Sequence, residues 1–531
     1  MSFLTRRPSV VARHGMVATS ETQAAVAGLR VLQEGGNAVD AAVATSAALC
    51  VTEPMSTGLG GDMFALTWSA KDRKVTALNG SGRSGGRASL EELVREGHRE
   101  MPQLSAHSVT VPGIVDGWHT LLKRHGSMPL SKLLKPAIDY ATGGFVVQKV
   151  LGKSWDYNAA KLAQHPSGGE LLLNGRAPRP GEVMRLPEMA EVLKSIARRG
   201  PKAFYKGKLA ERIAEYVQKM GGWLEKEDLE NHQSTWDEPI STEYRGVRVW
   251  ECPPNGHGIA ALMAMNIAEG FDIRGMGFQS VDTYHHLIES MRLAYADALQ
   301  YVADPAKVDV PMRVLLDKGY AAERRGQITC NGVVRHPRPG NVYATANTAY
   351  LTVVDGEGNA CSFINSLYES FGTGLVVPGT GIALHNRGAL FSLDPEHPNA
   401  LAPGKRPYHT IIPAMATRGD QMWLSFGVMG GFQQPQGQLQ VMANMVDFDL
   451  GPQEALDALR FSALIGNGVA LEAEVEGGTR EELIRRGHHV VTFGDENRSL
   501  FGGGQIIERD GDTGVLRGGS EPRKDGCAIG W

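Results

Sequence analysis

The chain has 531 residues and a formal net charge of −4, with 54 basic against 58 acidic side chains. This balance excludes the strongly basic surface typical of nucleic-acid and anionic-membrane binding, so we expect neither partner. The five scattered cysteines include no CxxC pair, which argues against a disulfide framework or a zinc site. No N-terminal apolar segment indicates a secretory signal, and no apolar run approaches the roughly 18 residues of a membrane span. We therefore expect a cytoplasmic protein.

The first predicted elements are two helices followed by two strands. Ser20 and Gln23 have the spacing of a helix-capping box, and the helix that they begin should end before the glycine pair at 35–36. A second, alanine-rich helix over 37–51 has small side chains that favour close packing. Alternating apolar residues predict strands at 62–68 and 74–78.

Residues 85 to 325 are predicted to be mostly helical, whereas short strands follow from about 341. Helical periodicity is clearest at 89–94, 131–141, 186–197 and 281–299. Strands are predicted at 350–355, 360–367, 374–377, 381–384 and 421–426. Because helices and strands mix without a strict βαβ alternation, the pattern favours a layered α+β domain.

The segment GRSGG at 82–86 matches G-x-S-x-G, the nucleophile elbow of α/β-hydrolases, with Ser84 as the nucleophile. An elbow needs a strand that runs directly into the serine and a helix that begins there. Here the strand ends near Leu78 and the next helix begins at Ser89, so a chance match is the better interpretation.

Two further motifs argue against a cofactor. His285, His286 and Glu289 share one predicted helix, but they do not form an HExxH motif, so we expect no metal. The glycine-rich turn at 58–61 lacks a Walker lysine and a GxGxxG frame, which argues against a nucleotide site.

The turn DGEG joins two strands and brings two hydroxyl side chains together. If Val354 pairs with Asn359, then Thr348 faces Asn365 with Ser366 alongside, give or take one residue. Ordinary strand hydroxyls would explain this pattern equally well.

A second glycine pair lies between a strand at 423–426 and a helix that has Pro435 near its start. Consecutive backbone N–H groups of Gly430 and Gly431 can point at one spot, beside the positive end of the helix. This is how an oxyanion hole is built, although a purely structural turn remains an open alternative.

Motifs along nearly the whole chain resemble the γ-glutamyltransferase (glutathione hydrolase) family of N-terminal-nucleophile hydrolases. They are GGNAVDAAVATSAALCVTEPMSTGLGGD (35–62), VTVPGIVDGWHTLLKRHGSMPLSKLLKPAI (109–138), NTAYLTVVDGEGNA (347–360), FGTGLVVPGTGIAL (371–384), PGKRP (403–407), MGGFQQPQG (429–437) and GGSEPRKDGCAIG (518–530). The resemblance implies an α+β fold, a four-layer αββα sandwich that forms one large domain from two autoprocessed chains.

The resemblance also implies the chemistry. The precursor would cut itself between Asn347 and Thr348, so that residues 1–347 and 348–531 form a heterodimer that could dimerise again. Thr348 would be the nucleophile and its freed α-amino group the base. Ser366 would support the nucleophile, and Gly430 and Gly431 would form the oxyanion hole. The substrate would be a small amide, and no cofactor is implied.

The departures from the family pattern fall on positions that bind the glutamyl head group. Where the family has an arginine, this chain has Ser81, and the nearest arginine is Arg83, two residues further on. Where the family has the aspartate that binds the substrate ammonium, this chain has Leu390. The other altered or candidate binding positions are Tyr368, Arg387, His409 and Thr410. Of these residues, Arg387, Arg83 and His409 could still bind a carboxylate.

Two substrate classes therefore remain open. γ-Glutamyl compounds such as glutathione could bind in a shifted pose, by hydrolysis or by transfer to an amine. Alternatively, the acyl group carries an acid but no α-amino group, as for cephalosporin (glutaryl) acylases and oxamate amidohydrolases in this family. A serine hydrolase that uses Ser84 and a non-catalytic relative that binds small acids are the remaining hypotheses.

Overall fold

The computed structural model describes residues 7–335, 347–464, 466–494 and 497–531, and two seven-stranded antiparallel sheets form its centre. Sheet A consists, in spatial order, of β1 (Val10–Ala12), β20 (Leu516–Ser520), β19 (Gly503–Arg509), β15 (Gln421–Met429), β14 (Ala414–Arg418), β9 (Val247–Glu251) and β8 (Ile240–Tyr244). Sheet B consists of β21 (Cys527–Gly530), β2 (Gly15–Thr19), β10 (Asn347–Asp355), β11 (Ala360–Tyr368), β3 (Asp62–Ser69), β4 (Lys74–Gly80) and β7 (Thr235–Asp237).

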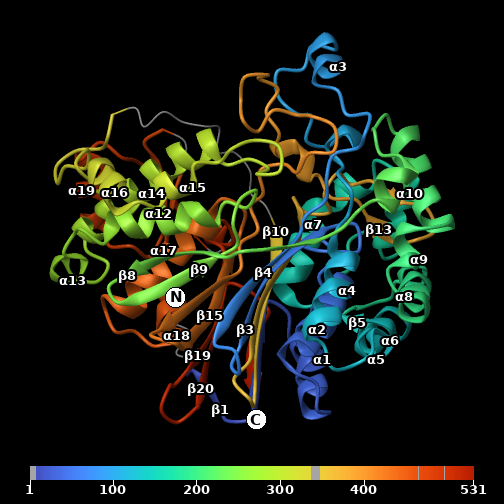
Figure 1. Cartoon of the computed structure of the whole chain (residues 1–531), viewed down its shortest axis with the longest axis horizontal. Helices are drawn as coiled ribbons and strands as arrows, with labels where there is room; N and C mark the ends of the chain where they lie inside the picture. The colour runs from blue at the N-terminus through green and yellow to red at the C-terminus, as the bar shows by residue number, and fades with distance from the viewer. Residues whose placement is uncertain (1–6, 336–346, 465, 495–496) are drawn as a thin grey trace.

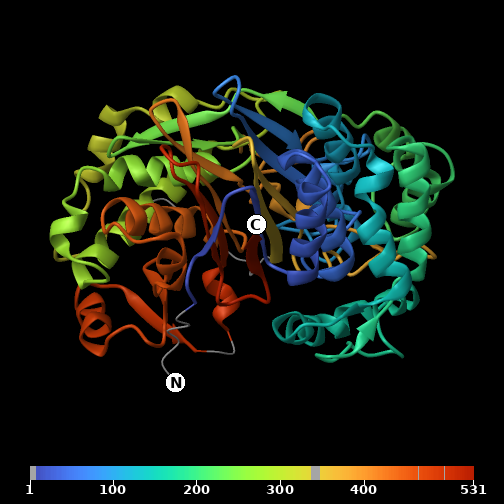
Figure 2. The ribbon, with the colours of Figure 1, turned by 90° about the horizontal axis from the view of Figure 1, so that it is seen from below.

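The two sheets pack face to face, with helices on their outer sides (Figures 1 and 2). An apolar cluster between the sheets includes Phe64, Tyr350 and Ile364 from sheet B and Met415 and Ile507 from sheet A. Sheet B is covered by α1 (Thr22–Gln33), α2 (Ala38–Thr52) and α4 (Ile114–His125), and sheet A by α12 (Gly258–Ala268) and α17 (Gln433–Val446). Helix α14 (Val281–Tyr301) packs on α12 and α17. Every residue of α2 and of α12 is buried, which explains their small, apolar composition.

The remaining elements lie around this centre. The helices are α3 (Leu90–Arg95), α5 (Leu130–Leu133), α6 (Lys135–Gly143), α7 (Lys149–Leu162), α8 (Pro187–Arg199), α9 (Lys202–Tyr205), α10 (Lys208–Lys219), α11 (Lys226–Glu230), α13 (Ile273–Met276), α15 (Met312–Leu315), α16 (Lys318–Arg325), α18 (Pro452–Asp457) and α19 (Gly477–Arg485). The short strands are β5 (Phe145–Val146), β6 (Val183–Met184), β12 (Val376–Val377), β13 (Ile382–Ala383), β16 (Phe461–Ala463), β17 (Gly468–Glu472) and β18 (His489–Phe493). No helix among the described residues is long and apolar enough to cross a membrane.

The hairpin of β10 and β11 is shifted by one residue from the predicted register. Val354 pairs with Ala360 rather than with Asn359, because the loop contains three residues and Gly358 adopts a φ of +82°. This left-handed conformation closes a three-residue hairpin loop and is readily adopted only by glycine. The same register, in which Ala349 pairs with Asn365, places Thr348 opposite Ser366, within the predicted margin.

Strand alternation places the first residues of β10 at one end of the space between the two sheets. Along β11, Ile364 lies in the cluster between the sheets, whereas Phe363 and Leu367 lie in the cluster under the helices. Ser366 has the same parity as Ile364, and it pairs with Asp62 on β3. Both polar side chains therefore belong to the layer between the sheets.

Candidate active site

Thr348 lies at the start of β10, and its side chain is almost completely buried, with 1% of its surface exposed. Its Oγ1 lies 3.3 Å from the hydroxyl of Ser366 and accepts a 3.4 Å hydrogen bond from Nε2 of Gln434. The other end of the Gln434 amide accepts a hydrogen bond from Ile412 N at 3.0 Å, which fixes its orientation. Ser366 also accepts a bond from Tyr368 N at 2.8 Å. The threonine hydroxyl therefore contacts strand β11 on one side and helix α17 on the other.

The glycine pair follows β15 directly and precedes α17. Gly430 and Gly431 have φ angles of +125° and +58°, which turn the chain sharply between the strand and the helix. Their carbonyls accept the N–H groups of Gln433 and Gln434, the first residues of α17. Neither glycine N–H donates a hydrogen bond to any of the residues that the structure describes. Two unpaired donors at a helix N-terminus provide a site for developing negative charge.

Asp62 is a buried carboxylate in the same layer. Its Oδ1 accepts hydrogen bonds from Gly82 N and Gly113 N, both at 3.1 Å. Its Oδ2 lies 3.1 Å from Nε2 of His409 and 3.5 Å from Nδ1 of His385. Burial alone would raise the pKa of Asp62, but His385, His409 and Arg387 together lower this pKa to about 2. The group is therefore ionised at neutral pH.

The two histidines beside Asp62 are neutral near pH 7. Burial lowers the pKa of His409 to about 3, and it also lowers the pKa of His385. His409 donates from Nε2 to Asp62, and its Nδ1 accepts a hydrogen bond from Ile411 N at 3.4 Å. Both nitrogens of His409 are thus engaged within the protein. The residue was predicted to bind a substrate carboxylate, but it has no free N–H group with which to do so.

Arg387 is completely buried, and its charge acts on Asp62. The carbon at the centre of its guanidinium group lies 4.6 Å from the centre of the Tyr368 ring, and its Nη1 donates to Thr410 Oγ1 at 2.7 Å. The backbone N–H of Tyr368 donates to Ser366, which contacts Thr348. Short contacts therefore link three of the predicted binding residues, Arg387, Tyr368 and Thr410, to the candidate nucleophile Thr348.

Three other predicted positions behave differently. Ser81 Oγ donates to Asn79 at 2.7 Å and accepts from Asn255 at 3.3 Å, so its hydroxyl is occupied inside the protein. The side chain of Arg83 is half-buried and forms no hydrogen bond or ion pair with the described part of the chain. Leu390 lies at the end of a short 3₁₀ helix and packs against the apolar cluster under sheet A.

The rival motifs are structural. Ser84 donates to Ala402 O at 2.6 Å and accepts from Lys405 N at 3.1 Å, and neither a strand nor a helix adjoins it. Its hydroxyl therefore anchors a loop. His285 lies 2.8 Å from both His488 and Thr329 O, and Glu289 pairs with Arg292 at 2.5 Å. Among the described residues, no group of three acidic, histidine or cysteine side chains could hold a metal.

The gamma-glutamyltranspeptidase family model matches residues 24–531. The chain belongs to the gamma-glutamyltranspeptidase family. It is 39% identical to the glutathione hydrolase-like YwrD proenzyme of Bacillus subtilis, over 98% of this chain and 99% of that protein. It is 35% identical to an acylase ACY 1 proenzyme of a Pseudomonas species, over 99% and 95% of the two chains.

A solved structure is similar to the chain over nearly its whole length. The cephalosporin acylase from Bacillus halodurans superposes with a TM-score of 0.93 and 47% identity, over 99% of this chain and 97% of that one. This member of the gamma-glutamyltranspeptidase family is therefore an enzyme, a hydrolase with the mixed α and β architecture of the N-terminal-nucleophile superfamily. Its relatives divide between glutathione hydrolase and acylase names.

The sequence reasoning missed two residues of the site. Asp62 directly follows the glycine turn at 58–61, whose backbone approaches Ser366 so closely that a Cβ on Gly61 would lie 2.6 Å from the Ser366 carbonyl oxygen. An acid at the end of such a turn was the available signal. Gln434, three residues after Gly431, carried no local signal, because only the folded structure brings it to Thr348.

Proposed function

We propose that this protein is a self-processing amidohydrolase in which Thr348 is the nucleophile. The observation that carries the proposal is the buried Thr348 hydroxyl, held by Ser366 and Gln434, at the end of the layer between the two sheets. The free N–H groups of Gly430 and Gly431 support it further. The same proposal includes the four-layer αββα sandwich built from two chains, 1–347 and 348–531.

The first reaction would be the cut between Asn347 and Thr348. The Thr348 oxygen attacks the carbonyl carbon of Asn347, and the peptide bond breaks as its nitrogen takes up a proton. The resulting ester is hydrolysed by water, which gives a carboxylate on Asn347 and a free α-amino group on Thr348. Until this cut, the nitrogen of Thr348 is an amide and cannot serve as a base.

After the cut, the α-amino group would activate the hydroxyl of the same residue. An α-amino group has a reference pKa of about 7.7–8.0, so a substantial fraction is unprotonated near neutral pH. Thr348 would attack the amide carbonyl of the substrate, the two glycine N–H groups would stabilise the oxyanion, and the amine would leave with a proton. Water would then release the acid from the acyl-enzyme, or a second amine would accept the acyl group.

The test is the variant Thr348→Ala, observed on a denaturing gel and by intact-mass measurement. We expect the wild type to give two fragments that correspond to 1–347 and 348–531, and the variant to remain one inactive chain. Thr352→Ala is the matched control, since Thr352 is a buried threonine of the same strand that contacts Ser425 instead. This control should be cleaved normally. An uncut wild type that still hydrolyses amides would refute the Thr348 mechanism.

A further inference from the structure

Arg387 has an unused pair of donors. Its guanidinium group is completely buried, yet Nε and Nη2 have no hydrogen-bond partner. Burial lowers the pKa of Arg387 to about 10, although Asp62 and Tyr368 act in the opposite direction, so the group is charged at neutral pH. A buried cation with unpaired donors is strongly unfavourable unless something binds there.

The contacts of Arg387 leave one edge of the guanidinium group available. Tyr368 stacks on its face, and Thr410 accepts from Nη1. The Nε and Nη2 groups together form the side edge, where two parallel N–H bonds match the two oxygens of a carboxylate. The tyrosine and the threonine thus fix the plane and the rotation of the guanidinium group, and neither contact uses the fork formed by Nε and Nη2.

This edge belongs to the layer that contains the nucleophile. One route runs from Arg387 to Tyr368, whose backbone N–H donates to Ser366, which in turn contacts Thr348. On the other side of the layer, Thr410 lies two residues before Ile412, whose N–H fixes the Gln434 amide that donates to Thr348. Arg387 therefore lies within a few side chains of the reacting hydroxyl on both routes.

The neighbouring acid does not satisfy Arg387. Both oxygens of Asp62 are engaged, one by two backbone N–H groups and the other by His409, with His385 close by. Asp62 forms no ion pair with Arg387. It compensates the charge of the arginine at a distance and leaves the fork free for an incoming anion.

The acidic side chains that act on Arg387 and Tyr368, which are Asp62 and Glu369, are not free to pair with an ammonium group. Leu390 is apolar, and Glu369, next to Tyr368, is paired with Lys161 at 3.5 Å. Both oxygens of Asp62 are already engaged. An α-amino group on the acyl chain would therefore lose its water without gaining a carboxylate.

We propose that the Nε and Nη2 fork of Arg387 binds a carboxylate of the acyl group, and that the preferred substrates are amides of dicarboxylic acids without an α-amino group. This inference rests on the proposed Thr348 mechanism and names its substrate class. Tyr368 and Thr410 act as positioning residues, because they orient the guanidinium group.

The experiment compares three p-nitroanilides on the processed enzyme. Glutaryl-p-nitroanilide carries the carboxylate alone, pentanoyl-p-nitroanilide has the same chain without it, and γ-glutamyl-p-nitroanilide adds the ammonium. We expect the wild type to favour the glutaryl compound over the other two in kcat/KM. In Arg387→Met the glutaryl compound should lose about 10- to 100-fold, mostly in KM, while pentanoyl turnover and self-cleavage persist. Arg387→Lys, which keeps the charge without the fork, should recover only part of the loss.

Two further variants keep the proposal testable if Arg387→Met does not fold. Thr410→Val removes only the contact to Nη1 and should raise KM for the glutaryl compound but not for the pentanoyl compound. In the wild type, free glutarate should inhibit competitively and pentanamide should not. Arg83→Met tests the rival receptor, and a selective loss of glutaryl turnover in that variant would overturn the assignment.

Failure of this inference differs from failure of the proposed mechanism. Equal turnover of glutaryl and pentanoyl compounds, or a glutaryl preference that survives in Arg387→Met, overturns the carboxylate fork alone. A preference for the γ-glutamyl compound overturns the exclusion of the α-amino group. A chain that stays uncut and hydrolyses none of the three compounds refutes the Thr348 mechanism, and the absence of glutarate binding by calorimetry would then overturn the fork as well.

Discussion

Ser366 contacts the Thr348 hydroxyl from the neighbouring strand, at 3.3 Å. We predict that Ser366→Ala slows self-cleavage and lowers kcat about 10- to 100-fold, because the threonine oxygen loses a hydrogen-bonding partner that orients it. Ser362→Ala is the control, since Ser362 lies on the same strand and bonds to Tyr350 OH at 2.7 Å instead. Time courses of cleavage and amide hydrolysis measure both effects. Full activity in Ser366→Ala would show that the serine only fills space.

Asp62 contributes a pH-dependent part of the stability. Its pKa is lowered from 3.8 to about 2 in the folded protein, where burial is outweighed by His385, His409 and Arg387. A lowered pKa means that the stabilisation is complete above about pH 4 and is lost as the pH falls towards 2. The shift corresponds to about 2 kcal/mol.

We therefore predict that Asp62→Asn lowers the free energy of unfolding at pH 7 by about 1–3 kcal/mol, because the amide loses the charge that Arg387 favours and weakens the hydrogen bonds from Gly82, Gly113 and His409. The difference from the wild type should shrink progressively below pH 4, because the wild-type carboxyl becomes neutral as well. Urea unfolding at a series of pH values measures this difference. A gap that stays constant from pH 7 to pH 2 would contradict the assignment of the charge to Asp62.

At the scale of elements, the glycine turn at 58–61 lets two segments approach closely. A Cβ on Gly61 would lie 2.6 Å from the carbonyl oxygen of Ser366, whereas a Cβ on Gly58 would meet only Leu367, at 3.8 Å. We predict that Gly61→Ala destabilises the protein by about 2–4 kcal/mol and slows self-cleavage, because it displaces the end of β11. Gly58→Ala should be nearly neutral. Equal melting temperatures for the two variants would contradict this explanation.

The local sequence pattern predicted several helices and strands correctly and others incorrectly. The alanine-rich helix appears as α2, and the strands at 62–68 and 74–78 appear as β3 and β4. The first helix does form, but Glu21 caps it instead of Ser20, whose hydroxyl donates to Glu53. The predicted helix over 131–141 is divided at Leu134 into α5 and α6. Strands β8 and β9 lie in the region predicted to be mostly helical, because edge pairing in sheet A is a long-range contact.

At the scale of the whole molecule, the proposed cut falls inside an interwoven structure. Strands β10 and β11 come after the cut, yet they lie between β2 and β3, which come before it. Sheet A also combines both parts of the chain. Strands β14 and β15, which follow the cut, pair with each other, and β14 pairs with β9, which precedes it. Separating the two fragments would require breaking the hydrogen bonds between strands in the centre of sheet B and in part of sheet A.

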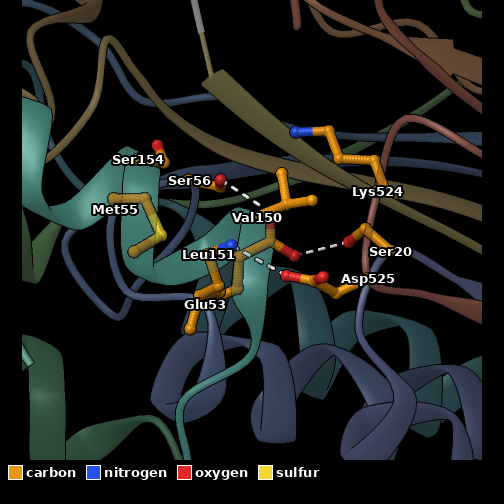
Figure 3. Close-up of a pocket in the computed structure, with 9 residues that line it drawn as sticks. All are labelled: Ser20, Glu53, Met55, Ser56, Val150, Leu151, Ser154, Lys524 and Asp525. Atoms are coloured by element: carbon orange, nitrogen blue, oxygen red, sulfur yellow. Dashed lines mark hydrogen bonds between the residues drawn. The ribbon is translucent and has the colours of Figure 1, made fainter. Parts of the chain in front are cut away.

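A small pocket of about 20 Å³ lies across the same boundary (Figure 3). Asp525 accepts a 2.7 Å hydrogen bond from Leu151 N at the start of α7, and Lys524 lies across from the buried Glu53. Burial raises the pKa of Glu53, and the hydroxyls of Ser20 and Ser56 donate to its carboxyl at 2.5 and 2.8 Å. The polar contacts here hold the C-terminal segment against the N-terminal half.

We therefore predict that the two fragments remain associated after cleavage. The processed enzyme should migrate as one species on a sizing column at low concentration and show two bands only on a denaturing gel. Unfolding should release both fragments in one transition, because each sheet contains strands of both. Fragments that separate without denaturant would contradict the topology.

The sequence by itself determined the family, the approximate hairpin register and the placement of Thr348 at the start of a strand, close to Ser366. Turn residues, strand alternation and motif order are local patterns, and they need no knowledge of distant contacts. Only the tertiary structure decided which candidate side chains are free to bind. Ser81 and His409 are occupied by internal partners, while Arg387 keeps two donors unpaired beside Tyr368 and Thr410. Hydrogen-bond satisfaction depends on groups far apart in the chain, so a residue type at a given position does not reveal whether its donors are available.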